Sequence, residues 1–403
     1  MSTRTLFIPG RIELFGKHVD YGGGPSHTCA IAEGITAEIT PISRPVLQLE
    51  DARTGRSARI ALRRDASAGG AHGGTYIATV ARRMARDFSP LKSGVRVRSS
   101  STLPRSAGLS SSSAFVTLLV IAVAEANRLP ERRAWRDQIT DSLSLAEYCG
   151  AVEMGAPFGT FPGERGVGTR GGAQDHVAIL CNEAETVGAF RYLPAERAGR
   201  ADFPAHWSIV VAVSGVRATK TGAARDDYNR ASDLVRSLLG LWNTATRRAD
   251  PSLASALRSA PDAAARLTAL ARDETEAPWY LARIEQFRRE TEVLVPEALA
   301  AIARGDGPAL GRLAVESQQR AETALRNPSP ETIFLARAAM AAGAHASSSF
   351  GAGFGGAVWA IVDTADVEAM IAHWRGSYAA SFPTRAPKAE FIVARPSAGV
   401  AWP

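Results

Sequence analysis

Six consecutive residues, Gly108-Leu-Ser-Ser-Ser-Ser113, stand directly before an apolar run that begins at Ala114. A helix that begins here would present backbone N–H groups, the positive end of its dipole and several hydroxyls at one place. Such groups bind phosphate oxygens and can coordinate Mg²⁺. The segment therefore predicts a polyphosphate site, with ATP as the expected ligand. A serine-capped helix without a ligand is the alternative for this segment taken by itself.

Two other stretches carry polar residues that could complete such a site. Arg11, His18 and Asp20 follow one another in a short strand and turn, where alternation can direct several side chains to one place. Phosphoryl transfer needs alignment, charge neutralisation and a group that accepts the hydroxyl proton. Asp175, on a glycine-rich turn, is the candidate base, and Arg11 beside it would lower its pKa and stabilise the moving phosphoryl group. The alternatives are an aspartate that only closes a loop and an arginine in a structural salt bridge.

Alternating β-like runs and helical stretches must position these groups, and they predict an α+β fold. The predicted helices cover 75–88, 114–126, 132–149, 228–246 and 252–271, with two more up to 341. The predicted strands include 35–39, 46–49, 95–97, 207–213 and 357–362, and a hairpin is expected from 177–181 and 187–192. Residues 193–204 have the composition of a linker, so we expect two domains, 1–195 and 205–403.

The composition excludes several classes of protein. The 403 residues carry a net charge of +7, but the charges are interspersed and no basic stripe with interleaved aromatics indicates nucleic-acid binding. The three cysteines, Cys29, Cys149 and Cys181, lie far apart and are typical of reduced core thiols. Since no apolar run of 18 residues and no export signal is visible, we expect a cytoplasmic protein that does not bind membranes.

Five motifs in a fixed order resemble those of the GHMP small-molecule kinases, and among these the galactokinases. Residues 10–21 are similar to the galactokinase signature GRxNxxGEHxDY, and residues 104–114 to PxGxGLSSSA. Residues 351–356, GAGFGG, match GGGFGG, while 171–175 resemble the CGIMD segment and 228–229 the YNxR segment. In the second motif Ser106 replaces a glycine, and Ser113 is an additional serine.

The resemblance implies a two-domain GHMP kinase fold. Its N-terminal domain would be similar to domain 2 of ribosomal protein S5 (ribosomal protein S5 domain 2-like), its C-terminal domain would be ferredoxin-like, and the active site would lie between them. The implied activity is transfer of the γ-phosphoryl group of ATP, with Mg²⁺, to a sugar hydroxyl, which we expect to be the anomeric one. The expected partner is a small polyol or sugar, and the expected state is a monomer or weak homodimer.

The resemblance also implies roles for individual residues. Asp175 would be the catalytic base and Arg11 its partner. The residues expected to bind ATP are Gly108, Leu109, Ser110, Ser111, Ser112 and Ser113, together with Tyr76 near the adenine, for which a core tyrosine is the alternative. The residues expected to bind the substrate are Lys17, His18, Asp20, Gly172 and Tyr228. Ser112, or a neighbouring serine, and Glu153 would bind Mg²⁺; Glu164, in the insertion 158–168, has the better spacing and is the alternative.

One departure from galactokinases concerns the substrate. Lys17 stands where galactokinases have a glutamate that hydrogen-bonds sugar hydroxyls, and Glu13 stands in place of an asparagine. Lys17 could bind a carboxylate, as in an acidic sugar, or it could pair with Glu13 and leave the net charge nearly unchanged. The rival functions are therefore a kinase for an acidic or modified sugar or cyclitol, and a non-catalytic galactokinase-like sugar sensor that acts on a transcriptional regulator.

Overall fold

The computed structural model describes residues 3–67, 73–104, 107–216 and 223–402, with only the backbone for 223–228. Its first sheet has the strand order β4-β3-β5-β2-β6-β7, and β1 pairs with β2. These strands are β1 (Arg4–Phe15), β2 (Ser26–Ile42), β3 (Val46–Asp51), β4 (Ser57–Ala61), β5 (Gly94–Ser101), β6 (Thr186–Arg191) and β7 (Glu196–Asp202). All pairs are antiparallel except β3 with β5.

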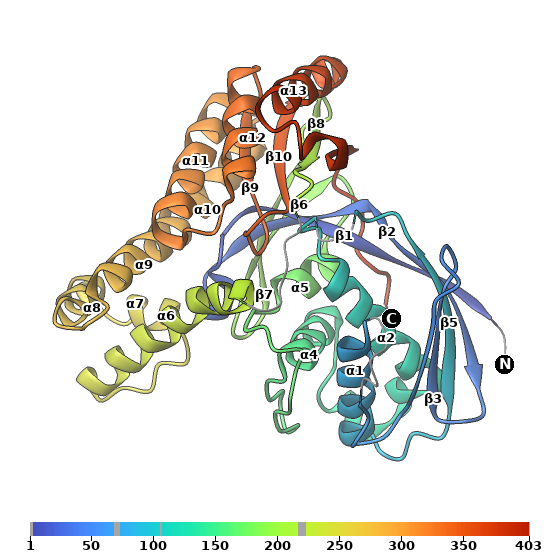
Figure 1. Cartoon of the computed structure of the whole chain (residues 1–403). Helices are drawn as coiled ribbons and strands as arrows, with labels where there is room; N and C mark the ends of the chain where they lie inside the picture. The colour runs from blue at the N-terminus through green and yellow to red at the C-terminus, as the bar shows by residue number, and fades with distance from the viewer. Residues whose placement is uncertain (1–2, 68–72, 105–106, 217–222, 403) are drawn as a thin grey trace.

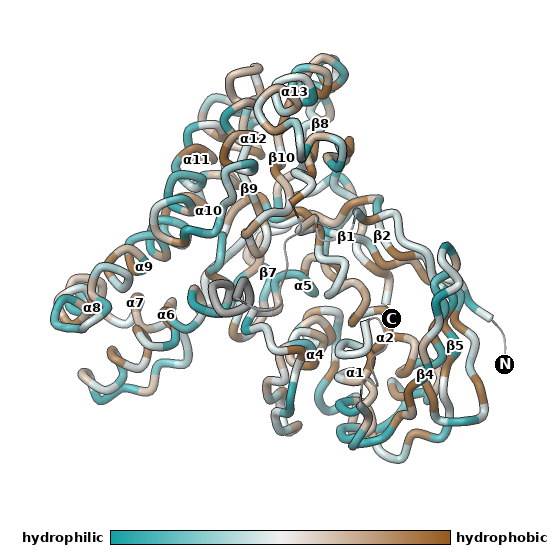
Figure 2. The backbone as a smooth tube through the Cα atoms, in the orientation of Figure 1, coloured by the Kyte–Doolittle hydropathy of each residue, from teal (hydrophilic) through white to brown (hydrophobic). Residues whose placement is uncertain are grey.

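Helices cover one face of this sheet (Figure 1). They are α1 (Gly74–Asp87), α2 (Ser111–Ala126), α3 (Arg133–Arg136), α4 (Ser142–Met154) and α5 (Gln174–Cys181). Most of the α2 side chains from Ser113 onward are buried, because this helix contacts β1, β2 and β5 on one side and α1, α4 and α5 on the others. Apolar residues extend along the strands that it faces (Figure 2). The serine run is thus carried by a helix that is enclosed on several sides.

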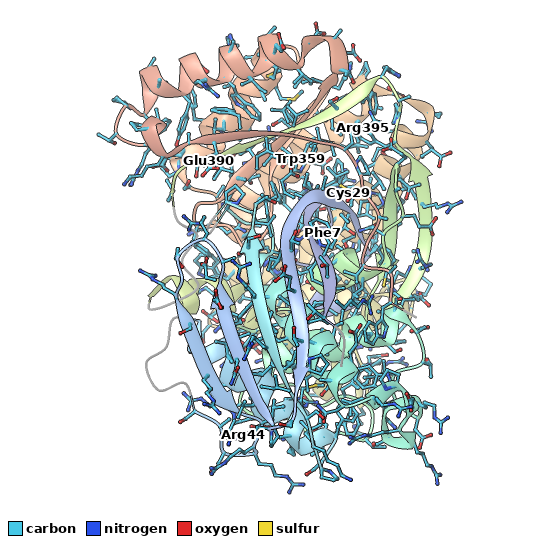
Figure 3. All side chains as sticks on the ribbon, turned by 90° about the vertical axis from the view of Figure 1, so that its right-hand side faces the viewer. Phe7, Cys29, Arg44, Trp359, Glu390 and Arg395 are labelled. Atoms are coloured by element: carbon cyan, nitrogen blue, oxygen red, sulfur yellow. The ribbon has the colours of Figure 1, made fainter. Side chains whose placement is uncertain are left out.

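The second sheet is antiparallel, in the order β11-β8-β10-β9, and its strands β8, β9 and β10 are buried on both faces. Its strands are β8 (Trp207–Val213), β9 (Ala346–Ser349), β10 (Ala357–Asp363) and β11 (Glu390–Ala394). Val210 and Val358 face α12 (Pro330–Ala341) and α13 (Val367–Ser381). Trp359 points the other way, toward Phe15 of β1, with ring centroids 6.1 Å apart, and lies at the junction of the two sheets (Figure 3).

Four helices form an arm beside the sheets, α6 (Ala223–Thr246), α7 (Leu253–Arg258), α8 (Ala263–Arg272) and α9 (Ala277–Arg289) (Figure 1). The arm has a small core of its own around Trp242 and Phe287, to which Val19 of the N-terminal motif also belongs. Two further helices, α10 (Val295–Arg304) and α11 (Gly307–Arg320), lie between the arm and the second sheet. The short helices are η1 (Asp20–Gly22), η2 (Leu129–Glu131), η5 (Thr364–Asp366) and η6 (Ala386–Lys388), all 3-10.

Two π-helical turns interrupt this part of the chain. The first, η3 (Glu290–Leu294), joins α9 to α10, and the second, η4 (Ala321–Leu325), follows α11. A π turn shifts the face that the helix presents, and such turns are frequent at functional sites. Here η3 begins with the buried Glu290, and η4 leads directly to the buried Asn327.

Several sequence predictions were wrong. Residues 177–181 belong to helix α5 and not to a hairpin strand, because this short apolar run is buried as a helix against β1, β2 and α4. Residues 193–204 are not a linker: they contain β7, whose exposed polar side chains give an edge strand the composition of a loop. The first sheet therefore extends to Asp202. The C-terminal end also returns to the first domain, where Ser397 N donates to Ala30 O at 2.8 Å.

The helices expected at 132–149 and 252–271 are each divided in two. Asp141 caps α4 by accepting from Ser144 N, and Ser252 caps α7 in the same way through Ser255 N. The strands expected around 95–97, 207–213 and 357–362 are confirmed as β5, β8 and β10. All three cysteines are buried free thiols. Among the helices of the described ranges, none has the length and hydrophobicity needed to span a membrane.

Candidate functional site

Arg11 and Asp175 form the ion pair at the centre of the site. Arg11 leaves β1 from a buried position, and its Nε and Nη2 atoms lie 2.8 and 2.6 Å from Asp175 Oδ1. Its Nη1 donates to Gly108 O at 2.6 Å. Asp175 lies in the first turn of α5 and is 22% exposed, so it remains accessible from outside. One guanidinium therefore holds both the candidate base and the start of the serine loop.

The N-terminus of α2 has the features of an anion site. Gly108 and Ser110 have φ values of +78° and +59°, which turn the chain sharply into the helix. Ser110 makes no side-chain cap, and its buried Oγ has no partner among the described residues. The turn 351–356 closes on this loop, since a Cβ added to Gly351 would lie 3.1 Å from Gly108 O. An uncapped helix end with an unpaired buried hydroxyl fits the phosphates of ATP.

Oxygen ligands gather beside this helix end. Ser113 Oγ donates to Glu153 Oε2 at 2.9 Å and lies 3.3 Å from Asp175 Oδ2. His176 Nε2 lies 2.9 Å from the same Glu153 oxygen and fixes that carboxylate from behind. A hydroxyl and two carboxylates are the hard donors that Mg²⁺ binds together with substrate phosphates. The side chains present thus fit the metal that the sequence led us to expect.

Ser113, and not Ser112, is the serine that contacts Glu153. Ser112 instead hydrogen-bonds the hydroxyl of Tyr76, whose pKa burial raises to about 12. Tyr76 therefore lies at the serine loop, close enough to Glu153 for that carboxylate to influence it. The prediction that it contacts adenine is not tested by these contacts.

Glu164 lies away from the site. It is paired with Arg82 at 3.0 Å and Arg86 at 3.2 Å on α1. Two aromatic side chains of the same insertion, Phe158 and Phe161, pack on Tyr148 with centroids 5.5 and 6.1 Å away. The insertion is thus fixed to α1 and α4, and of the two candidate glutamates only Glu153 faces the serine loop.

His18 and Asp20 mark the other end of the site. His18 has a positive φ of +57°, and its Nε2 lies 3.0 Å from Asn327 Nδ2 while its Nδ1 lies 3.1 Å from the Tyr21 hydroxyl. Asp20 Oδ2 accepts from Gln174 N at 3.3 Å. Burial, and then the nearby Asp175 carboxylate, raise the pKa of Asp20 to about 6.

Gly172 is required beside this carboxylate, because a Cβ at that position would overlap Asp20. The side chain of Tyr228 and residue Ser106 lie outside the described part of the structure. The next residue, Asn229, is described: its Oδ1 accepts from Arg170 N at 2.8 Å, and its Nδ2 donates to Gly168 O at 3.2 Å. The start of α6 is thereby attached to the loop that leads to Asp175.

Lys17 and Glu13 do not pair, although both are described and buried. The Lys17 ammonium donates to Ser317 Oγ of α11 at 3.1 Å and to Ser348 Oγ of β9. Glu13 Oε2 instead accepts from Gln174 Nε2 at 2.8 Å. The pairing expected as one of two alternatives is therefore wrong as a direct contact, although each charge lies near enough to influence the other.

A second buried carboxylate, that of Glu290, compensates the charge of Lys17. Glu290 Oε1 accepts from Ser317 Oγ at 2.6 Å, and its Oε2 accepts from Gly16 N at 3.0 Å. Burial lowers the pKa of Lys17, and Glu290 is the carboxylate that most opposes this decrease. The sequence analysis missed Glu290, Ser317, Ser348 and Asn327. Glu290, Ser317 and Ser348 lie in helices or strands and Asn327 lies between η4 and α12. None of them belongs to a recognisable motif, so nothing in their spacing indicated a site.

Models of known protein families match three parts of the chain. The galactokinase galactose-binding signature matches residues 4–41, the GHMP kinases N terminal domain matches 75–160, and the GHMP kinases C terminal model matches 298–380. The first segment contains Arg11, which contacts Gly108 before the serine loop, and Lys17, which contacts Ser317 of the third segment.

Similar proteins cover nearly the whole chain. A galactokinase of Streptomyces coelicolor is 26% identical over 405 residues, which span 97% of this chain and 92% of that protein. A galactokinase of Thermococcus kodakarensis is 25% identical, over 98% of this chain and 99% of its own. The crystal structure of Lactococcus lactis galactokinase complexed with galactose has a TM-score of 0.79 at 21% identity, covering 99% of this chain and 95% of that one. For Methanococcus jannaschii mevalonate kinase the TM-score is 0.62 at 13% identity, with 98% and 99% covered.

Proposed function

We propose that this chain, which belongs to the GHMP kinase family, transfers the γ-phosphoryl group of ATP to the anomeric hydroxyl of a sugar. The observation that carries the proposal is the Arg11–Asp175 pair, which is bonded through Arg11 to the carbonyl of Gly108. A base and a phosphate loop held by one side chain is an arrangement suited to in-line transfer. The galactose-binding signature over residues 4–41 supports a sugar as the acceptor.

Asp175 would accept the proton of the attacking hydroxyl. As the oxygen attacks, its bond to the γ-phosphorus forms and the bond from that phosphorus to the bridging oxygen of ADP breaks. Arg11 holds Asp175 Oδ1 in place and keeps a positive charge near the moving phosphoryl group. Oδ2 of the same carboxylate lies on the Ser113 side, so the base stands between the phosphate loop and the acceptor.

Ser113 and Glu153 are the residues that would hold Mg²⁺, which when bound neutralises phosphate charge. His176 orients Glu153 from the far side. At the acceptor end, Asp20 and His18 would bind sugar hydroxyls, and the resemblance adds Tyr228. The occurrence of galactokinases among the similar proteins favours a hexose of the galactose type.

The experiment is ADP release with ATP, Mg²⁺ and a panel of free hexoses, pentoses, uronic acids and cyclitols. We expect turnover with at least one neutral sugar, and a product whose phosphate is on C1 by ³¹P NMR. Asp175→Asn should reduce kcat by roughly 10²- to 10⁴-fold while ATP still binds. Turnover that survives in Asp175→Asn, or ATP binding without turnover on any acceptor, would refute the proposal.

A further inference from the structure

Lys17 is occupied by the protein itself. Its ammonium is buried, 3% exposed, and donates to hydroxyls from two elements of the second domain, Ser317 and Ser348. Ser317 passes the interaction on to Glu290, which is fully buried. A lysine held by two hydroxyls and compensated by an internal carboxylate has its charge already neutralised. It has little to offer a carboxylate on a substrate.

Glu13 is in the opposite situation. Its side chain is also buried, with 4% of the residue exposed, and Oε2 is bonded to Gln174. Its other oxygen, Oε1, has no hydrogen-bond partner among the described residues. A buried acceptor without a donor is costly, and in native proteins such an atom calls for an explanation. A donor supplied by a ligand provides one.

The position of Glu13 indicates which ligand this is. Glu13 lies two residues after Arg11 on β1, so alternation places the two side chains on the same face of the strand. Gln174, to which Glu13 is bonded, directly precedes Asp175, and its backbone N–H is bonded to Asp20. Gln174 thus connects Glu13 to Asp175, the candidate base, and to Asp20, which we expect to bind the sugar.

We propose that Glu13 Oε1 accepts a hydrogen bond from a hydroxyl of the acceptor, and that the acceptor is consequently an uncharged polyol and not an acidic sugar. This inference rests on the proposed function, since it concerns the acceptor of the same site. The acceptor-binding carboxylate of this chain is Glu13, four residues before the position that carries a glutamate in galactokinases. Lys17 serves as the internal counterion that connects the turn after β1 to α11 and β9.

Electrostatics supports the neutral acceptor. Gln174 is bonded to both Glu13 and Asp20 and directly precedes Asp175, so the three carboxyl groups lie in one region, whereas Arg11 is committed to Asp175. A carboxylate on the substrate would face this group of acceptors without an available cation and would be repelled. Hydroxyls, which donate, match the same group.

The experiment measures acceptor binding separately from turnover. Wild type and Glu13→Gln are titrated calorimetrically with galactose and with galacturonic acid, and then assayed for KM of each sugar and of ATP. We expect wild type to prefer galactose, and at pH 9, where Glu13 is ionised, Glu13→Gln should weaken its affinity by roughly 10- to 100-fold, the loss expected for a hydrogen bond to a charged group. The KM of ATP should remain unchanged. Glu147→Gln, which removes a half-buried carboxylate bonded to Ala195 N, is the matched control and should bind normally.

A pH profile separates a binding role from a structural one. Burial raises the pKa of Glu13 to about 8, against the opposing effects of Arg11 and Lys17 and with the added effect of Asp175. The ionised carboxylate is the better acceptor, so galactose affinity of wild type should increase between pH 7 and 9. In Glu13→Gln this increase should disappear. Loss of affinity without a change in the profile would mean that Glu13 acts only on the structure.

The outcomes distinguish this inference from the function on which it rests. Binding of galactose without turnover would refute the proposed kinase activity, and the affinity of Glu13→Gln for galactose would still decide whether Glu13 binds the acceptor. The role of Glu13 would be refuted if Glu13→Gln turned over with unchanged acceptor affinity, or if wild type preferred galacturonic acid. Either result would leave the proposed kinase activity standing. Absence of binding by every sugar would overturn both.

A substitution toward the galactokinase pattern gives a second check. Lys17→Glu by itself should lower stability and activity, because it places a carboxylate beside Glu290. Combined with Glu13→Asn, it restores the pattern of that family at both positions. If Lys17→Glu by itself improves galactose affinity, then Lys17 and not Glu13 controls the acceptor, and the inference is wrong.

Discussion

The phosphate end and the acceptor end of this site are built in different ways. At the phosphate end, the α2 N-terminus, Ser113, Glu153 and Asp175 all come from the first domain, and Arg11 of the same domain joins Asp175 from 164 positions away. At the acceptor end, Lys17 reaches Ser317 and Ser348, which are 300 and 331 positions away. The polar side chains of the first end come from one domain, whereas the contacts of Lys17 at the second exist only because two domains meet.

The difference agrees with where the chain departs from its relatives. The serine loop keeps the family motif apart from Ser106 and Ser113, whereas the acceptor end replaces an asparagine and a glutamate with Glu13 and Lys17. A phosphate site serves every member of the family, so its geometry is constrained. An acceptor site can change, provided that each buried charge obtains a partner, and Glu290 is the partner here.

The largest effect expected at the acceptor end is on stability. Lys17→Met should lower the free energy of unfolding by about 3–5 kcal/mol, since it leaves the buried Glu290 without its cation. Urea denaturation measures this. The double variant Lys17→Met with Glu290→Gln removes both charges and should recover most of the loss. If the single variant is as stable as wild type, the two ends do not differ in the way described.

Substitutions at the phosphate end should change kcat and not the free energy of unfolding. Arg11→Met should reduce kcat by roughly 10²- to 10³-fold, because Asp175 and the loop carbonyl of Gly108 lose their common donor. Arg11→Lys keeps the charge but loses the planar guanidinium, so its kcat should lie between those of Arg11→Met and wild type. Steady-state kinetics at saturating ATP tests this. Equal rates for Arg11→Lys and wild type would show that only charge matters at this position.

The smallest effect distinguishes two neighbouring serines. Ser113→Ala should raise the Mg²⁺ concentration needed for half-maximal rate by on the order of 10-fold, while Ser112→Ala should leave it nearly unchanged. The reason is that Ser113 contacts Glu153 and Ser112 contacts Tyr76. A titration of rate against free Mg²⁺ provides the comparison. A larger shift in Ser112→Ala would assign the metal to the residue that the sequence suggested first.

Much of the phosphate end could be predicted from the sequence. The start of α2 and the positions of Asp175 and Glu153 beside it follow from motifs whose residues lie close together in the chain. Local spacing determines which backbone N–H groups are exposed at a helix end, so such motifs carry their geometry with them. The choice between Ser112 and Ser113 could not be made, because one position along a helix turns the side chain by about 100°.

The sequence by itself determined the family pattern, the phosphate loop and the unusual pair of residues at 13 and 17. Only the tertiary structure decided what that pair does, because Ser317, Ser348 and Glu290 belong to elements with no motif of their own. The structure also shows that the first sheet continues to Asp202, beyond the predicted end of the first domain. The edge strand β7 is mostly exposed and therefore has no apolar pattern in the sequence. A buried charge is stable only beside its partner, and in this chain folding brings Glu290 to Lys17 through Ser317, which lies 300 positions from Lys17 in the chain.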